Sequence, residues 1–267
     1  MTRDSIFWGA VLVLAGITLM IGNLLGLEVW GLLWPLLLIA VGLWIVWGVA
    51  SGRRYEPETE TLSIPLEGAE AAKVQLHYGV GALHVAGGAA PDALLAGAFA
   101  YGVQHRTKRD GRVLEADLSV PSQRIVQFAA PWNWWQNARP DWDVQLNQNV
   151  PLSLEVETGA SDVTLDLSAL QVRELEISTG ASAVEVTLPA AAGHTQVEME
   201  GGAASFKLRV PEGVAARIRS TGGLSGTTVD TTRFPRLGDI YQSPDYDTAI
   251  HRVDLKLETG VSSVDVR

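Results

Sequence analysis

The 267-residue sequence contains no cysteine, and this absence removes several classes of protein at once. Disulfide scaffolds, thiolate zinc sites, iron–sulfur proteins and enzymes with a cysteine nucleophile are all excluded. Basic residues are also scarce, because 20 lysines and arginines stand against 30 aspartates and glutamates and leave a net charge of −10. Non-specific nucleic-acid binding needs an excess of positive charge, so we predict no nucleic-acid partner.

Motifs for catalysis or cofactor binding are missing as well. The sequence has no phosphate-binding Gly-x-x-x-x-Gly-Lys-Ser/Thr loop and no Gly-x-Ser-x-Gly nucleophile elbow. Its five histidines never have the i, i+4 spacing of a helical zinc site, and we interpret His77 and His84 as half-exposed strand residues on either side of Gly79. We therefore predict a protein that is not an enzyme and that holds no cofactor and no metal ion.

Charged residues are absent from two runs near the N-terminus, 6–27 and 29–50. As a helix, each run would be about 33 Å long, enough to cross a hydrocarbon layer of about 30 Å. Residues 1–54 are therefore predicted to form a two-helix transmembrane hairpin that turns near Glu28. A signal peptide followed by a buried helix is the alternative, although no small-residue cleavage site follows the first run.

Three arginines predict the orientation of this hairpin. Arg3 precedes the first run, Arg53 and Arg54 follow the second, and the connecting loop has neither lysine nor arginine. The positive-inside rule then places both chain ends in the cytoplasm. We predict a multi-pass protein of the cytoplasmic membrane, with two spans and a cytoplasmic C-terminal domain.

Residues 55–267 form the second predicted domain, and one motif recurs along them. Each copy alternates apolar and polar residues, turns at a corner of the Thr-Gly-Ala-Ser type and alternates again, as a half-buried strand does on each side of a turn. The copies cover residues 74–85, 154–167, 175–188, 197–210, 218–222 and 255–266. A repeat of about twenty residues made of short strands predicts a parallel β-solenoid, with an antiparallel β-sandwich as the alternative. We expect the corner glycines to adopt positive φ and their small neighbours to let stacked corners pack closely.

Two segments depart from the repeat. Residues 94–120 are interpreted as two longer strands joined by a hairpin turn at residues 109–111. Residues 131–142 hold four tryptophans, Trp132, Trp134, Trp135 and Trp142. Tryptophan is enriched in interface hot spots, so these four are the candidate contact residues for a partner or the membrane. The alternative is that they cap the open end of the solenoid core.

The first fifty residues resemble the membrane region of LiaI/LiaF-like bacterial proteins. The resemblance is carried by Ile6-Phe-Trp-Gly9, Leu14-Ala-Gly16, Leu32-Leu-Trp-Pro35-Leu-Leu-Leu-Ile39 and Gly42-Leu-Trp44. The corner repeats and Tyr241-Gln-Ser-Pro-Asp-Tyr246 are similar to the toastrack β-solenoid domain of LiaF-type envelope stress proteins and of adhesin-like proteins. The resemblance implies a regulator that restrains a membrane sensor histidine kinase. This chain has two predicted spans where such regulators often have four, and no residue-level motif carries a site across.

Three functions follow as hypotheses. The first is a membrane-anchored regulator or scaffold in cell-envelope stress signalling, acting by contact with a sensor kinase system. The second is a surface-facing adhesin-like or envelope structural protein, which requires the domain to lie outside the cell. The third is a self-assembling membrane scaffold, a homo-oligomer whose solenoids stack end to end.

Overall fold

The computed structural model describes residues 38–39, 41–43, 59–121 and 141–267. Residues 38–39 and 41–43 are helical, and residues 59–121 and 141–267 belong to one compact unit that forms a 15-stranded sheet. Its strands are β1 (Thr59–Pro65), β2 (Ala71–Gly87), β3 (Ala93–Ala100), β4 (Gln104–Asp110), β5 (Val113–Ser119), β6 (Asp141–Leu146), β7 (Pro151–Asp166), β8 (Gln171–Thr179), β9 (Ala183–Thr187), β10 (His194–Gly201), β11 (Ser205–Arg209), β12 (Ala215–Val229), β13 (Arg236–Leu237), β14 (Ile240–Gln242) and β15 (Arg252–Val266).

The predicted membrane spans, 6–27 and 29–50, lie almost wholly outside the described residues. Within the part of the chain that is described, no helix is long and apolar enough to cross a membrane. The hairpin and the domain boundary at residue 54 therefore stay predictions.

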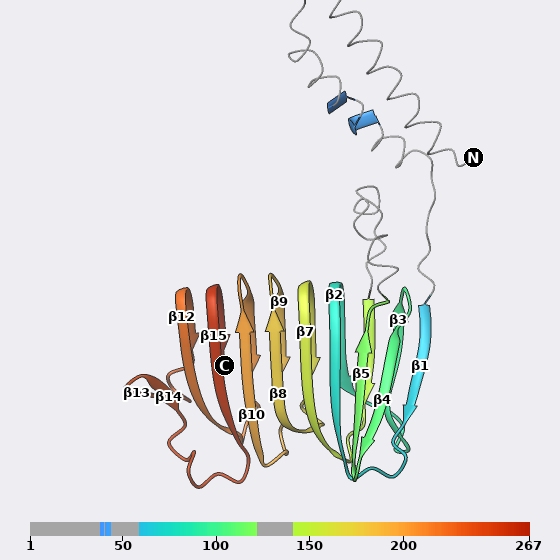
Figure 1. The fold of residues 1–267 in the computed structure, drawn as a ribbon. Coiled ribbons are helices and arrows are strands. Elements are labelled where there is room, and N and C mark those ends of the chain that lie inside the picture. The colour runs from blue at the N-terminus through green and yellow to red at the C-terminus, as the bar shows by residue number, and fades with distance from the viewer. Residues whose placement is uncertain (1–37, 40, 44–58, 122–140) are drawn as a thin grey trace, which may run out of the picture. The chain divides into compact units, whose positions relative to one another are not determined.

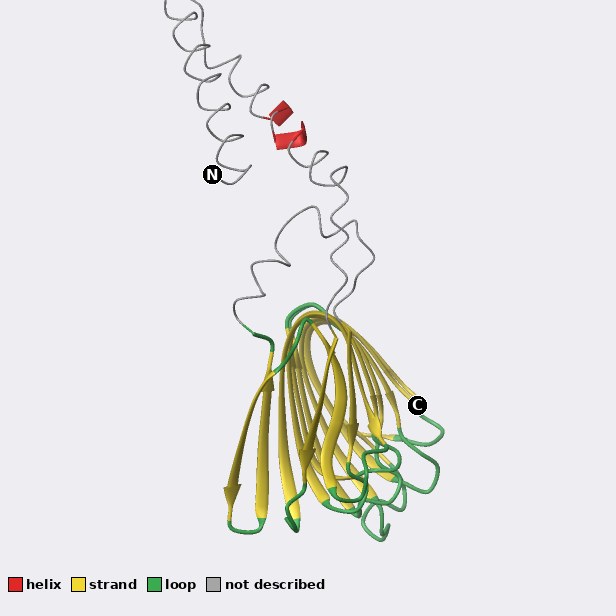
Figure 2. Cartoon of the chain, turned by 90° about the vertical axis from the view of Figure 1, so that its right-hand side faces the viewer, coloured by secondary structure: helices red, strands yellow, loops and turns green. Residues whose placement is uncertain are grey.

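Each coil of the solenoid consists of two arms joined by a tight corner. Strands β2, β7, β12 and β15 bend through the corner, whereas β8–β9 and β10–β11 are separate strands on its two sides. We call the half before the corner arm 1, the half after it arm 2, and the opposite end of the strands the base. Figure 2 shows the two layers of strands meeting at the corners and separating toward the base.

Pairing between successive coils is parallel, and its register is continuous apart from a shift between β7 and β8 at Leu152 and Ser153. Arm 1 of β2 pairs with β7, β7 with β8, β8 with β10, and β10 with β15, all parallel. Residues that face inward therefore form continuous rows between the arms. One such row is fully buried and consists of Leu76, Val156, Ile177, Met199 and Leu257. The parallel β-solenoid is confirmed, and burial of these apolar rows against one another is its main source of stability.

The order of coils in space differs from their order in the sequence. The C-terminal strand β15 lies between β10–β11 and β12, and it pairs in parallel with both (Figure 1). The last repeat of the sequence is thus an interior strand, and β12 forms the final coil. Residues 230–251, which include β13 and β14, connect β12 to β15. Within this connection, β14 pairs antiparallel with the arm 1 edge of β12.

The interpretation of residues 94–120 as two strands is wrong, because the structure has three. β3 ends at Ala100, where Tyr101 and Gly102 take φ values of 68° and 83° and turn the chain away. β4 and β5 then form an antiparallel pair around Gly111, so the predicted hairpin turn at residues 109–111 is confirmed.

The corner glycines of successive coils stack on one another, and we call this row the glycine ladder. Glycine is required in it for a different reason from the one expected. Gly159, Gly180, Gly202 and Gly260 are not among the positive-φ residues. A Cβ on Gly159 would lie 2.7 Å from the carbonyl oxygen of Gly79, and one on Gly260 would lie 2.7 Å from that of Gly202. Glycine is required here because successive backbones approach closely, so the expected close packing of corners is confirmed and the positive φ is wrong.

Candidate functional site

Buried hydroxyls line the inner side of the corners. Thr158 and Thr179 are hydrogen-bonded through their Oγ1 atoms at 2.9 Å, and Thr179 Oγ1 donates to Ser182 Oγ at 2.5 Å. The backbone N–H of Ser161 also donates to Ser182 Oγ at 3.2 Å. Threonine and serine of two successive Thr-Gly-Ala-Ser corners thus satisfy one another inside the coil.

The hydroxyl row is interrupted at the next coil. Gly201 and Ala204 occupy the threonine and serine positions of the β10–β11 corner, and Gly222 lies beside Thr259 on the other flank. Thr259 Oγ1 and Ser262 Oγ are consequently buried without a hydrogen-bond partner among the described residues. The β15 corner repeats the motif, but Thr259 has glycine on both flanks and Ser262 has Ala204 on its β11 side.

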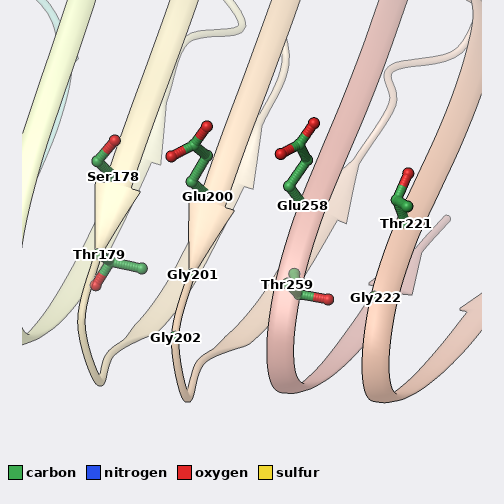
Figure 3. Close-up of a pocket in the computed structure, with 9 residues that line it drawn as sticks. All are labelled: Ser178, Thr179, Glu200, Gly201, Gly202, Thr221, Gly222, Glu258 and Thr259. Carbon is green, nitrogen blue, oxygen red and sulfur yellow. The ribbon is translucent and has the colours of Figure 1, made fainter.

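An open groove of about 670 Å³ crosses arm 1 at these corners. Ser178, Glu200, Glu258 and Thr221 share one register row and extend from the same side of β8, β10, β15 and β12 (Figure 3). The remaining lining is provided by Thr179, Gly201, Gly202, Gly222 and Thr259. The glycines have no side chains, so part of the groove wall is bare backbone.

Carboxylates dominate the outer surface of arm 1 around the groove. We define the acidic face as the outward carboxylates of β7, β8, β10 and β15, namely Glu155, Glu157, Glu174, Glu176, Glu198, Glu200, Asp254 and Glu258. Lys256 is the main cation among them, with its Nζ 2.6 Å from Glu198 and 2.8 Å from Glu258. These hydrogen bonds raise the pKa of Lys256.

The pKa shifts on this face follow from the arrangement of charge. Partial burial and the neighbouring carboxylates Glu155, Glu198 and Glu174 raise the pKa of Glu176, which lies at the centre of the face. Burial would also raise the pKa of Glu155, but hydrogen bonds from Gln75 and Lys73 lower it overall. The pKa of Glu176 is raised even though Lys73 and Lys256 pair with Glu155 and Glu198, so a cationic group placed beside Glu176 would be stabilised.

A second polar cluster joins the 230–251 connection to the solenoid at its base. His194 Nε2 lies 2.7 Å from Asp254 Oδ2, and the Arg217 guanidinium lies 3.6 Å from the same carboxylate and 4.0 Å from the Tyr246 ring centre. Burial and the hydrogen bond to Asp254 raise the pKa of Tyr246 to about 12. Ser243 Oγ accepts a hydrogen bond from the Ala216 N–H. The Tyr241–Tyr246 motif thus attaches the connection to β12.

This base cluster was missed at the level of sequence. Its members come from β10, β12, β15 and the connection, and β15 becomes a neighbour of β10 only through its insertion between coils. The Tyr241–Tyr246 motif was the one available signal, but it gave no indication of its partners.

Of the four tryptophans predicted as contacts, Trp142 belongs to the core. It lies in β6, is fully buried, and packs edge-on against Phe99 with ring centres 5.0 Å apart, while Tyr78 lies at 5.1 Å. As a partner or membrane contact Trp142 is a wrong prediction, because no part of its ring reaches the surface. Trp132, Trp134 and Trp135 lie outside the described residues.

In the described ranges, no group of three or more histidine, aspartate or glutamate residues is arranged to hold a metal ion. His77 instead contacts Glu157 at 2.8 Å and Asp117 at 3.6 Å, as a half-exposed strand residue in a row of carboxylates.

Comparison with known proteins gives a family and a fold. The model of the N-terminal domain of toast_rack, DUF2154, matches residues 53–209. The crystal structure of a proposed cell adhesion protein from Clostridium sporogenes is similar with a TM-score of 0.70 and 22% identity, covering 79% of this chain and 98% of that chain. A proposed adhesin from Bacteroides fragilis covers 79% and 97% at 8% identity, but its TM-score of 0.29 is too low to support a shared fold. No curated protein matches the chain.

The family match begins at residue 53, so the likeness of the first fifty residues to LiaI/LiaF-like proteins rests on their sequence alone. The similarity to the Clostridium structure supports the fold alone, because a sequence identity below a quarter does not extend to function.

Proposed function

The chain belongs to the family of toast_rack N-terminal domains, and from this premise we propose that it is a non-enzymatic, membrane-anchored scaffold of the bacterial cell envelope. Its function is to bind a protein partner through the acidic face of arm 1. The observation that carries the proposal is the acidic face itself, a charged surface on a rigid sheet with an open groove at its corner end.

The chemistry of this face indicates the kind of partner. Glu176 is surrounded by like charges, and Glu200 borders the groove next to Glu258. A basic segment laid across β8, β10 and β15 would relieve this repulsion, and rows of charge at fixed spacing would define its register. Continuous parallel pairing keeps the surface rigid, so little conformational entropy is lost when a partner binds.

Two cellular roles use the same surface. Arg3, Arg53 and Arg54 favour a cytoplasmic domain, and with the LiaF-like resemblance they support a regulator that contacts a membrane sensor histidine kinase in envelope stress signalling. The proposed cell adhesion role of the similar Clostridium protein supports instead a surface-facing, adhesin-like role.

Topology separates these two roles. A reporter active only inside the cell and another active only outside are fused in turn to Arg267. Signal from the inside reporter supports the regulator, and signal from the outside reporter contradicts it and supports the adhesin-like role.

The partner contact is tested by site-specific photo-crosslinking of the full chain in native membranes. A photoreactive residue replaces Ser178 at the groove or, as a control, Thr164 on the outer face of arm 2. We expect a discrete adduct from position 178 only. Changing Glu176, Glu198 and Glu200 together to glutamine should abolish it, whereas Asp143→Asn, Glu185→Gln and Asp265→Asn on arm 2 should not. An adduct of equal yield in the neutralised variant would contradict the proposal.

The tryptophan segment supplies a second candidate contact, with the membrane interface. Residues 122–140 connect the corner end of β5 to the corner end of β6, and β1 also begins at the corner end. Any membrane anchor that precedes β1 is therefore joined to the domain at the corner end, where β5 ends and β6 begins. In vesicles with brominated lipid we expect tryptophan quenching that falls when Trp132, Trp134 and Trp135 are changed to alanine; unchanged quenching would contradict membrane contact.

A further inference from the structure

Arm 2 has two edges that no other described strand covers. At one end β1 pairs with β3 alone, and at the other end residues 224–229 of β12 pair with β15 alone. β14 covers β12 only at residues 217–219, which belong to arm 1. Figure 1 shows β1 and β12 at opposite ends of the row of strands.

These two edges lack the features that prevent sheet edges from pairing. The arm 1 edge strand β4 is exposed at every position and contains Arg106, Lys108 and Arg109, as expected of a guarded edge. Residues 224–229 of β12 contain no charge and no proline, and β1 contains one charge, Glu60, with its proline only at the last position. An unguarded edge of six or seven residues is a template for another strand.

The strand directions permit a continuous sheet between copies. β1 is antiparallel to β3, and β3 is antiparallel to β6, so β1 runs in the same direction as the arm 2 strands. Residues 224–229 of β12 also run from corner to base. A second copy placed beside β12 by translation along the stack would therefore present β1 in parallel orientation, which is the pairing between β6, β2, β7, β9, β11, β15 and β12 in arm 2.

The arm 1 surfaces beside these edges are complementary in charge. β4 contains two arginines, one lysine and one aspartate, whereas the connection 230–251 has four aspartates and two arginines. That connection also exposes Leu237 by 64% and Ile250 by 82%, two of the large apolar side chains left uncovered in the described residues. In a translated stack, β4 of one copy faces this connection of the next.

We propose that copies of this chain assemble head to tail, with residues 224–229 of β12 pairing in parallel with β1 of the next copy. The contact is heterologous, so it extends into a linear array and does not close as a dimer. Translation keeps the corner end of every copy, and with it every Thr59 at the start of β1, on one side of the array. The pairing is independent of the partner proposed for the acidic face, and either can fail without the other.

Crosslinking tests which edges meet, since the native chain has no cysteine. Thr61 on β1 and Thr228 on β12 are both exposed on the outer face of arm 2. We expect the full chain in detergent with both Thr61→Cys and Thr228→Cys to give a ladder of oligomers with a short bismaleimide. Either single variant should stay monomeric, and a mixture of the two should stop at dimers.

The matched control pairs Thr61→Cys with Thr164→Cys, because Thr164 lies in the same register row as Thr228 but in the interior strand β7. This control should give no ladder. A dimer from Thr228→Cys alone would indicate symmetric edge pairing and overturn the proposal. Absence of a ladder from the double variant, with both thiols accessible to a monomaleimide, would also overturn it.

Sedimentation of the otherwise native chain in detergent gives the second readout. Thr228→Lys places a charge on the unguarded edge and should weaken self-association at least tenfold, while Thr164→Lys should leave it unchanged. Arg106→Glu with Lys108→Glu should weaken it less, and more so at low salt. A strictly monomeric native chain at all concentrations would refute head-to-tail assembly.

Discussion

The corners of β7 and β8–β9 and the corner of β15 have nearly the same sequence, yet their interiors differ. In the first two corners, Thr158, Thr179 and Ser182 satisfy one another's hydroxyls. In the β15 corner, Thr259 and Ser262 are buried at equivalent positions without partners in the described structure. The glycine ladder runs through all three corners.

This difference separates two roles that the Thr-Gly-Ala-Ser motif combines. The glycine is required by the backbone of the preceding coil, which approaches closely at each of these corners. The hydroxyls need hydrogen-bond partners on side chains of the neighbouring coils. They are satisfied where two successive coils both have the motif. A repeat can therefore keep its shape while one copy loses its hydrogen bonds.

The largest effect is expected from Gly159→Ala. The new Cβ would lie 2.7 Å from a backbone oxygen of Gly79, and relief requires the two coils to separate. We expect a loss of about 2–3 kcal/mol in the free energy of unfolding, measured by chemical denaturation of the full chain in detergent. Gly79→Ala is the matched control, since a Cβ there meets nothing within 4 Å and should change stability by less than about 1 kcal/mol. Equal losses of stability in both variants would show that close approach of the backbones does not require glycine at position 159.

Removing a hydroxyl should have opposite signs in the two kinds of corner. Thr179→Val takes a partner from Thr158 and Ser182 and should cost about 1–2 kcal/mol. Thr259→Val removes a buried hydroxyl without a partner, and valine suits a strand, so stability should rise by up to about 1 kcal/mol. The same denaturation measurement compares them, and destabilisation by both would show that Thr259 is satisfied.

The unsatisfied corner should also be repairable. Ala204 lies between Ser182 and Ser262, so Ala204→Ser would offer Ser262 a partner and extend the hydroxyl row. We expect a gain of about 0.5–1 kcal/mol. In a Ser262→Ala background this gain should fall, and a double-mutant cycle measures the coupling. A gain of the same size in both backgrounds would assign it to another cause.

Acidification should reduce the stability contributed by contacts at the base of β15 and leave the contribution of its corner unchanged. Burial alone would raise the pKa of Asp254, but hydrogen bonds with Tyr246 and His194, with Arg217 nearby, lower it overall. Because the folded state favours the ionised form, Asp254 stabilises above its unfolded pKa of about 3.9, and this contribution is lost as pH falls through the lower folded pKa.

The size of this pH effect is limited by solvent, since the Asp254 side chain is 37% exposed. We expect less than about 1 kcal/mol, visible as a shallower pH dependence of unfolding in Asp254→Asn between about pH 4 and pH 2. Thr179→Val should shift the whole curve without changing its slope, because its hydrogen-bond partners Thr158 and Ser182 are not titratable. If the pH dependence of unfolding in Asp254→Asn were as steep as in the native chain, Asp254 would not be the group responsible.

Much of the fold was predictable because the repeat encodes it locally. Alternation on both sides of each corner defines the two arms, and copies of similar length define parallel stacking of coils. The proline positions agree, since Pro151 begins β7 and Pro189 and Pro211 follow β9 and β11. The acidic face was predictable in part, as the polar half of that alternation.

The remainder depended on contacts between residues distant in the sequence. Nothing local distinguishes β15 as an interior strand, because its sequence fits equally well at the end of the stack. Trp142 was grouped with three nearby tryptophans, although its place in β6 is decided by Phe99 and Tyr78. The corner glycines were assigned a turn conformation because the close approach of Gly79 to Gly159 is invisible within one copy.

The insertion of β15 has a consequence for biosynthesis. The residues that fill the gap between β11 and β12 are synthesised after all the other strands of the domain, so a chain that stops before β15 has an incomplete sheet. Until β15 is made, β12 has no parallel neighbour and the edge of β10 and β11 stays open. A truncation before Arg252 would remove an interior strand and separate the final coil from the rest. Synthesis of β15 is thus the step that closes the stack.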